Sequence, residues 1–122
     1  MSVDLDDVPE ELRPAVAAAL GHAGVDEGHV SVELVDAARI RELNRDHRGV
    51  DSATDVLAFP VDSDGEAPGP RELGDVVVCP GESADVAEAA VHGVLHLCGY
   101  DHESDDGEML DLQDRVMASF ER

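Results

Sequence analysis

The chain has 122 residues and a formal net charge of −21, because 29 acidic side chains are set against only eight basic ones, all of them arginine. This length predicts one domain covering residues 1–122, and a hydrophobic content of 43% with 2% aromatic residues predicts a modest aliphatic core. The negative charge argues against ordinary nucleic-acid binding, and no segment resembles a signal peptide or a membrane span, so a cytoplasmic protein without membrane contacts is expected.

The N-terminal half predicts alternating strands and helices. Residues 2–5 are typical of a short edge strand, and residues 9–21 of a helix that ends at a glycine. Residues 29–35 alternate apolar and polar side chains, which predicts a half-buried strand. Asp36 then suits the N-cap of a helix that runs to about Arg48.

The C-terminal half predicts two more strands and two more helices. Residues 54–59 and 73–78 are strand-like, and the Asp-, Gly- and Pro-rich residues 62–70 between them predict a loop. Ser83 suits the N-cap of the next helix, and a last helix begins at residue 104 or 105. The pattern as a whole predicts an α+β fold, in which helices cover a small mixed β-sheet.

The most informative segment reads H-x-x-x-H-x-x-G-x-x-H and runs from His92 to His102. On a helix, His92 and His96 lie on one face, four residues apart. Gly99 can adopt the left-handed conformation that ends a helix, and His102 can return toward the same point. Three neutral imidazoles with a fourth position for water form a catalytic zinc site, so we expect one Zn²⁺ per chain, held on a helix and the following turn.

This spacing matches the long zincin pattern H-E-x-x-H-x-x-G-x-x-H, except at one position. The protease pattern has a glutamate general base after the first histidine, and here that residue is Gly93. Cys98 is two residues from His96 and should face away as a small buried thiol. Asp101 is a candidate catalytic residue, which could either orient a ligating histidine or act as a base on metal-bound water.

Half of the basic residues fall within ten positions, and these are Arg39, Arg41, Arg45 and Arg48. Most such runs are solvated helix faces with ion pairs to their neighbours, but this one could also contact phosphates. The last residue of the run, Arg48, could clamp a scissile phosphate or could simply pair with Asp46 or Asp51. The other three arginines are candidate RNA-binding residues by their charge.

Three segments together resemble the YbeY family, the bacterial metal-dependent endoribonucleases of ribosomal RNA maturation. Asn44-Arg45-x-x-Arg48 followed by residues 54–60 is similar to the first motif of that family, and residues 73–78 are similar to the second. Residues 92–102 match its three-histidine signature. The resemblance covers nearly the whole chain, although the stretch between the second motif and the signature is shorter than is usual in the family.

The resemblance implies zinc bound by His92, His96 and His102, and a functional cleft that contains Arg48. It implies single-strand-specific cleavage in small-subunit rRNA processing, with ribosomal RNA and ribosome-associated proteins as partners. The corresponding mechanism has a zinc-activated water and an arginine that assists at the phosphate. Two alternatives remain: a metalloprotease-like zinc hydrolase, which the absent glutamate disfavours, and a non-enzymatic ribosome-associated module with structural zinc, which would need a fourth protein ligand.

Overall fold

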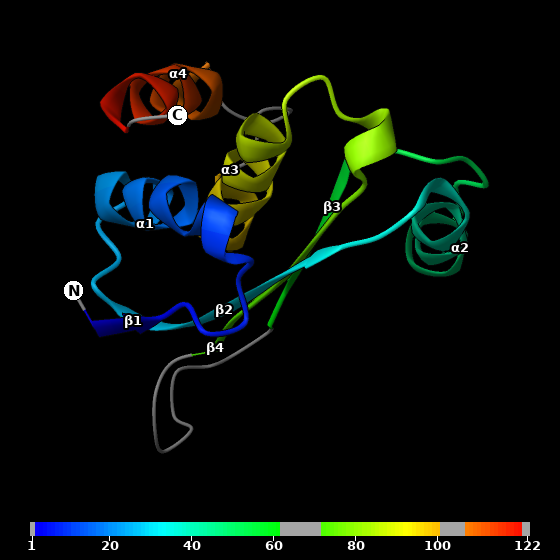
Figure 1. The fold of residues 1–122 in the computed structure, drawn as a ribbon, viewed down its shortest axis with the longest axis horizontal. Coiled ribbons are helices and arrows are strands. Elements are labelled where there is room, and N and C mark those ends of the chain that lie inside the picture. The colour runs from blue at the N-terminus through cyan, green and yellow to red at the C-terminus, as the bar shows by residue number, and fades with distance from the viewer. Residues whose placement is uncertain (1, 62–71, 101–106, 121–122) are drawn as a thin grey trace.

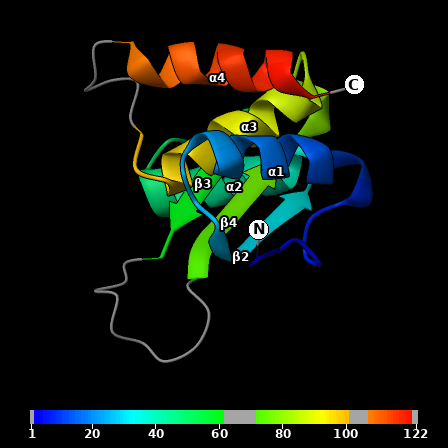
Figure 2. The same ribbon diagram turned by 90° about the vertical axis from the view of Figure 1, so that its left-hand side faces the viewer.

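The computed structural model describes residues 2–61, 72–100 and 107–120, which form a mixed β-sheet with helices on both faces (Figures 1 and 2). The strand order is β1-β2-β4-β3, with β2 parallel to both of its neighbours and β3 antiparallel to β4 at one edge. The strands are β1 (Ser2–Asp4), β2 (Glu27–Leu34), β3 (Val56–Pro60) and β4 (Glu72–Val78). The predicted α+β fold and the short N-terminal edge strand are therefore confirmed.

Three helices lie on one side of the sheet: α1 (Arg13–His22), α3 (Val86–Leu97) and α4 (Glu108–Ser119), of which α4 packs on α1 and α3 away from the strands (Figure 2). Helix α3 lies directly on β3 and β4, and both α1 and α4 pack beside it (Figure 2). The main core between these elements is aliphatic, as the composition predicts. Its fully buried side chains include Val16, Leu20, Val30, Val76, Val91, Val94, Leu95, Met109 and Val116. Burial of each such side chain stabilises the fold by about 1.5–3 kcal/mol.

Helix α2 (Ala37–Arg48) packs on the opposite face, where Ile40 joins a second, smaller apolar cluster with Leu57, Val77 and Cys79. The Asp36 side chain accepts a hydrogen bond from the backbone N–H of Arg39, which confirms the predicted N-cap. Across the described ranges, no helix has the length and apolar character needed to cross a membrane.

Several helix starts differ from the prediction. The segment expected as one helix over residues 9–21 begins with a 3₁₀ turn at Glu10–Leu12, and α1 follows with Pro14 in its first turn, where a missing N–H costs nothing. The N-cap of α3 is Asp85 and not Ser83, because the Ser83 hydroxyl donates to the Cys79 carbonyl instead. Helix α4 begins after Gly107, whereas its predicted start and the predicted loop 62–70 lie outside the described residues.

Candidate active site

An open cleft of about 760 Å³ lies beside α3 and brings together three of the predicted site residues. Its wall is formed by the end of α2, by β3 with the residues before it, and by α3 with the turn that follows. The lining residues are His47, Arg48, Thr54, Asp55, Val56, Leu57, Ala58, Phe59, Pro60, His92, Gly93, His96, Gly99 and Tyr100. Histidine and arginine side chains from separate elements, α3 and α2, therefore share one solvent-accessible space.

The two histidines of the cleft are positioned by the amphipathic pattern of α3. Asp85 caps the helix by accepting a hydrogen bond from the Glu88 N–H. The side chains of Ala90, Val91, Val94 and Leu95 are fully buried in the main core. His92 and His96 are half-buried and line the cleft, on the face that the core does not use.

The turn after α3 has the glycine conformation that the sequence predicts. Gly99 has φ +98°, in the left-handed region, and its N–H donates to the His96 carbonyl at 3.0 Å. The N–H of Tyr100 donates to the Leu95 carbonyl at 3.1 Å, which completes the Schellman pattern of a helix C-terminus. The turn brings the Tyr100 carbonyl back to the ring of His96.

Hydrogen bonds fix the orientation of both imidazole rings. His92 Nδ1 lies 2.8 Å from Gln113 Oε1, and His96 Nδ1 lies 2.9 Å from the Tyr100 carbonyl oxygen. Because both partners are oxygen acceptors, each Nδ1 is expected to donate, and the neutral form of each ring then has its lone pair on Nε2. The two Nε2 atoms are only 3.2 Å apart. Facing lone pairs repel unless a cation is shared between them, so this pair could hold a metal through Nε2.

Gly93 shows why the glutamate of the protease pattern is absent. A Cβ atom at this position would lie 2.5 Å from Val76 Cγ1 and 3.0 Å from Val56 Cγ2, so α3 approaches the sheet too closely for any side chain. A glutamate here would force the side chains of Val76 and Val56 to move. Gly93 therefore has a packing role between α3 and the sheet, and it also leaves the chain without the general base of the protease pattern.

Arg48 lines the cleft from the last turn of α2, and the helix ends immediately afterwards at Gly49. Its side chain is exposed. Neither carboxylate proposed as its ion-pair partner is used in this way, because Asp46 pairs with Arg45 and Asp51 with Arg41. Within the described ranges Arg48 makes no ion pair, so its guanidinium is available to an anionic ligand.

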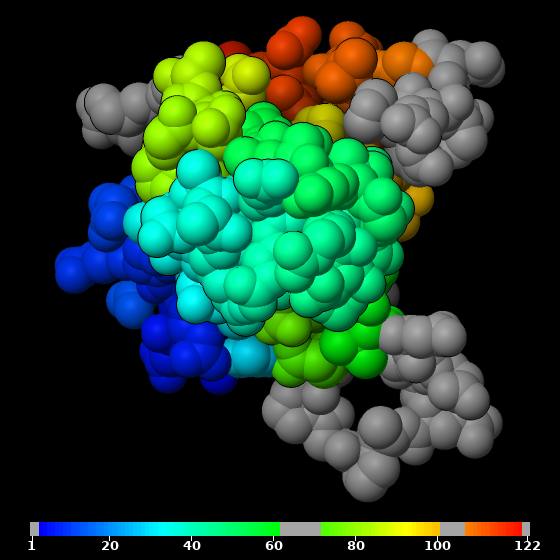
Figure 3. Space-filling model, turned by 90° about the vertical axis from the view of Figure 1, so that its right-hand side faces the viewer, coloured from blue at the N-terminus to red at the C-terminus, as the bar shows by residue number. Residues whose placement is uncertain are grey.

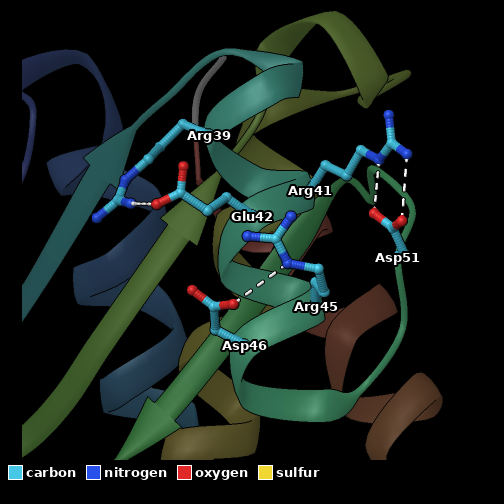
Figure 4. Close-up of polar contacts among 6 residues, drawn as sticks. All are labelled: Arg39, Arg41, Glu42, Arg45, Asp46 and Asp51. Atoms are coloured by element: carbon cyan, nitrogen blue, oxygen red, sulfur yellow. Dashed lines mark hydrogen bonds and ion pairs between the residues drawn. The ribbon is translucent and has the colours of Figure 1, made fainter.

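Helix α2 forms the centre of the face shown in Figure 3, and the three other arginines of the run extend from it outside the cleft lining (Figure 4). Each is matched by a carboxylate: Arg39 to Glu42 at 2.8 Å, Arg41 to Asp51 at 2.7 Å, and Arg45 to Asp46 at 3.3 Å. The hydrogen bond from Arg41 lowers the pKa of Asp51 and raises that of Arg41 itself. The local excess of positive charge in the sequence is thus largely compensated in three dimensions.

Two predicted site residues, Asp101 and His102, lie outside the described residues. Sequence reasoning also missed several contributors to the site. Gln113 comes from α4 and supports His92 through a contact between residues 21 positions apart, which no local pattern could indicate. His47 and Phe59 line the cleft as well, and the position of His47 immediately before Arg48 was the available signal.

A protein-family model described as Endoribonuclease YbeY matches residues 1–121. The chain belongs to this family of endoribonucleases, and the resemblance seen in its three motifs is confirmed.

The chain is similar over most of its length to other sequences of the family. It is 36% identical to the endoribonuclease YbeY of Bacillus cytotoxicus, over 96% of this chain and 92% of that protein. It is 41% identical to the endoribonuclease YbeY of Moorella thermoacetica, over 85% of this chain and 79% of that protein. The solution structure of TM1509 from Thermotoga maritima is similar with a TM-score of 0.53 and 34% identity, over 88% of this chain and 77% of that one.

Proposed function

We propose that this chain is a zinc-dependent endoribonuclease that cuts single-stranded segments of small-subunit ribosomal RNA during ribosome maturation in the cytoplasm. One observation carries the proposal: the Nε2 atoms of His92 and His96 are 3.2 Å apart in a cleft that also contains Arg48. This arrangement offers a cation site and a phosphate-binding group in one space. Family membership supports the endoribonuclease activity, and the histidine pair and Arg48 in the cleft support the metal-dependent mechanism.

The donor set fits one zinc ion per chain. Imidazole nitrogen is a preferred zinc ligand, and each ligating ring has an oxygen acceptor on its other nitrogen, as metal-bound histidines usually do. In the proposal His102 is the third ligand, from the spacing of the motif. When bound, zinc would lower the pKa of a coordinated water and polarise a phosphoryl oxygen.

The residues of the chain would perform the positioning. Arg48 is always protonated and offers a planar fork of donors, so it would hold the scissile phosphate and stabilise the charge that develops on it. Gln113 and the Tyr100 carbonyl would keep the two imidazoles in the ligating tautomer. Asp101 would act close to His102, either by orienting a ligand or by moving a proton.

The remaining arginines would contribute to RNA affinity and not to the reaction. Arg39, Arg41 and Arg45 already have carboxylate partners, but all three ion pairs are exposed to solvent. Exposed ion pairs are weak, so an RNA phosphate could replace the carboxylate in each. Ribosomal RNA and ribosome-associated proteins are the partners in this proposal.

The two alternatives have less support. A protease would need a glutamate at Gly93, where a Cβ would already collide with Val76. A structural zinc site would need to be closed by a fourth protein ligand. Among the described residues no group of three or more His, Cys, Asp or Glu side chains could hold a metal, so such closure would have to come from outside those ranges.

The test is cleavage of a ribosomal RNA fragment by zinc-loaded protein, compared between two arginine variants. Arg48→Ala should lower kcat by about 100-fold or more, as loss of a group that stabilises transition-state charge does. Arg41→Gln, a matched control on the same helix, should mainly raise KM. Equal effects of the two substitutions on kcat would remove Arg48 from the mechanism, and absence of zinc-dependent cleavage by the unmodified protein would overturn the proposed function.

A further inference from the structure

Aromatic rings are scarce in this chain, yet they gather at the cleft. The sequence contains one tyrosine, two phenylalanines and no tryptophan. Two of these three residues, Phe59 and Tyr100, line the cleft, and the imidazole of His47 lines it as well. The core needs few aromatic rings, because aliphatic side chains fill it. The concentration of rings at the cleft therefore calls for a local explanation.

His47 and Phe59 form a paired platform from two different elements. Their ring centroids are 4.9 Å apart with an interplanar angle of 64°, an edge-to-face contact. Phe59 is half-buried in β3 and packs against the cluster of Ile40, Leu57, Val77 and Cys79, so its position is set by the core. His47 is exposed in the last turn of α2. The anchored phenylalanine thus restricts an imidazole that remains open to solvent.

We propose that His47, backed by Phe59, stacks on an unpaired nucleobase of the RNA, beside the phosphate held by Arg48. This inference rests on the proposed function and adds a reason for single-strand specificity. His47 and Arg48 are consecutive residues that both line the cleft. They can therefore contact a base and an adjacent phosphate of the same RNA strand. Bases in a duplex have both faces stacked, whereas an unpaired base offers a face to a protein ring.

Stacking also compensates for the charge of this chain. A protein with a net charge of −21 gains little from long-range attraction to a polyanion, and the three arginines outside the cleft on α2 are already paired with carboxylates. Base–ring stacking requires no positive charge and accepts every base, because every base has a π face. It can therefore supply affinity that the electrostatic field does not.

The experiment compares three histidine variants of the full chain. The probe is a short oligouridine with phosphorothioate linkages and a single 2-aminopurine, whose fluorescence falls when the base stacks. The unmodified protein should quench the probe. His47→Ala should abolish the quenching and raise KM for single-stranded RNA by roughly 5- to 150-fold, the range of one stacked base. His22→Ala, an exposed histidine in the last turn of α1, is the matched control and should leave both quantities unchanged.

The third variant separates stacking from proton transfer. His47→Phe keeps a flat ring but cannot exchange a proton, so it should restore quenching and KM to near the unmodified values. If His47→Phe is as impaired as His47→Ala, or if His47→Ala quenches normally, the stacking site is wrong. If the unmodified protein quenches the probe but cleaves no RNA, the stacking site stands and the proposed function is the part that fails.

Discussion

Two histidine sites in this chain use both ring nitrogens, but they have opposite partners. In strand β2, His29 is partly exposed; its Nε2 lies 2.7 Å from Asp7 Oδ2, and its Nδ1 lies 2.6 Å from Glu72 Oε2. In the cleft, the Nδ1 atoms of His92 and His96 contact an amide and a peptide oxygen, and their Nε2 atoms face each other at 3.2 Å. Carboxylates surround one imidazole, whereas neutral oxygens orient the other two.

The difference suits the two sites to different cations. Both nitrogens of His29 must donate to carboxylates, so the ring is an imidazolium, and the hydrogen bond to Asp7 in particular raises its pKa above the ordinary value of 6.5. In the cleft, the Nδ1 atoms contact neutral oxygen acceptors and the Nε2 atoms converge on each other, which suits a metal ion. The carboxylates therefore favour a proton at His29, while the neutral acceptors leave the cleft pair suited to the zinc site that we propose.

The largest expected effect separates the two sites by metal content. His96→Ala should reduce bound zinc from one ion per chain to a trace and abolish RNA cleavage, because the remaining ligands hold zinc poorly. His29→Gln should retain one zinc ion and full activity. Elemental analysis after dialysis measures the zinc content of both variants, and an RNA cleavage assay measures their activity. A His96→Ala protein with full zinc occupancy would show that the metal lies elsewhere.

A smaller effect is expected from the acceptor that orients His92. Gln113→Leu removes the oxygen that receives the Nδ1 hydrogen, so zinc affinity should fall by about 10- to 100-fold. Gln113→Glu keeps an acceptor at the same position and should retain most of the affinity. Competition with a chromophoric chelator measures the dissociation constants. Equal affinities for the two variants would show that Gln113 does not control the tautomer of His92.

The packing of α3 provides a third test, since the cleft pair depends on how closely this helix approaches the sheet. Gly93→Ala should destabilise the fold by about 1–3 kcal/mol, because the added Cβ would lie 2.5 Å from Val76 Cγ1. The helix propensity of alanine offsets only about 0.5–1 kcal/mol of this. Gly81→Ala, where a Cβ would meet nothing within 4 Å, is the control. Urea unfolding should separate the two variants, and equal midpoints would contradict the close approach.

Local patterns were enough to predict most of the fold and part of the cleft. The four-residue spacing of His92 and His96, the glycine conformation at Gly99 and the N-cap at Asp36 depend on neighbouring residues, and all three appear as predicted. The wrong N-cap at Ser83 has a local cause too, because Asp85, two residues later, is an equally suitable cap and the serine hydroxyl is occupied by the Cys79 carbonyl.

Contacts between distant segments were not predictable in the same way. The ion pair of Arg41 is made with Asp51 after the chain has left α2, so this pair depends on the path of the chain beyond the helix, whereas the pairs of Arg39 and Arg45 are local. His29 gathers Asp7 and Glu72 from separate elements, which no spacing in the sequence could indicate. The Gln113 contact with His92 likewise depends on how α4 packs against α3.

The smallest expected effect is a pH dependence of stability at His29. Its raised pKa means that the folded state binds the proton more tightly than the unfolded state. The stabilisation is fully present below pH 6.5 and is lost as the pH rises through the higher, folded-state pKa. The unfolding free energy of the unmodified protein should therefore fall relative to that of His29→Gln over this window. Urea unfolding between pH 6 and pH 9 measures the difference, and a constant difference would contradict an imidazolium at His29.

The central claim, that imidazole Nε2 atoms hold zinc at an open site, is tested most directly by X-ray absorption at the zinc edge of the loaded protein. The account predicts only nitrogen and oxygen neighbours at about 2.0–2.1 Å, with a multiple-scattering pattern from imidazole rings and one light ligand in addition. A sulfur neighbour at about 2.3 Å would place Cys98 or Cys79 on the metal and would contradict the three-histidine site.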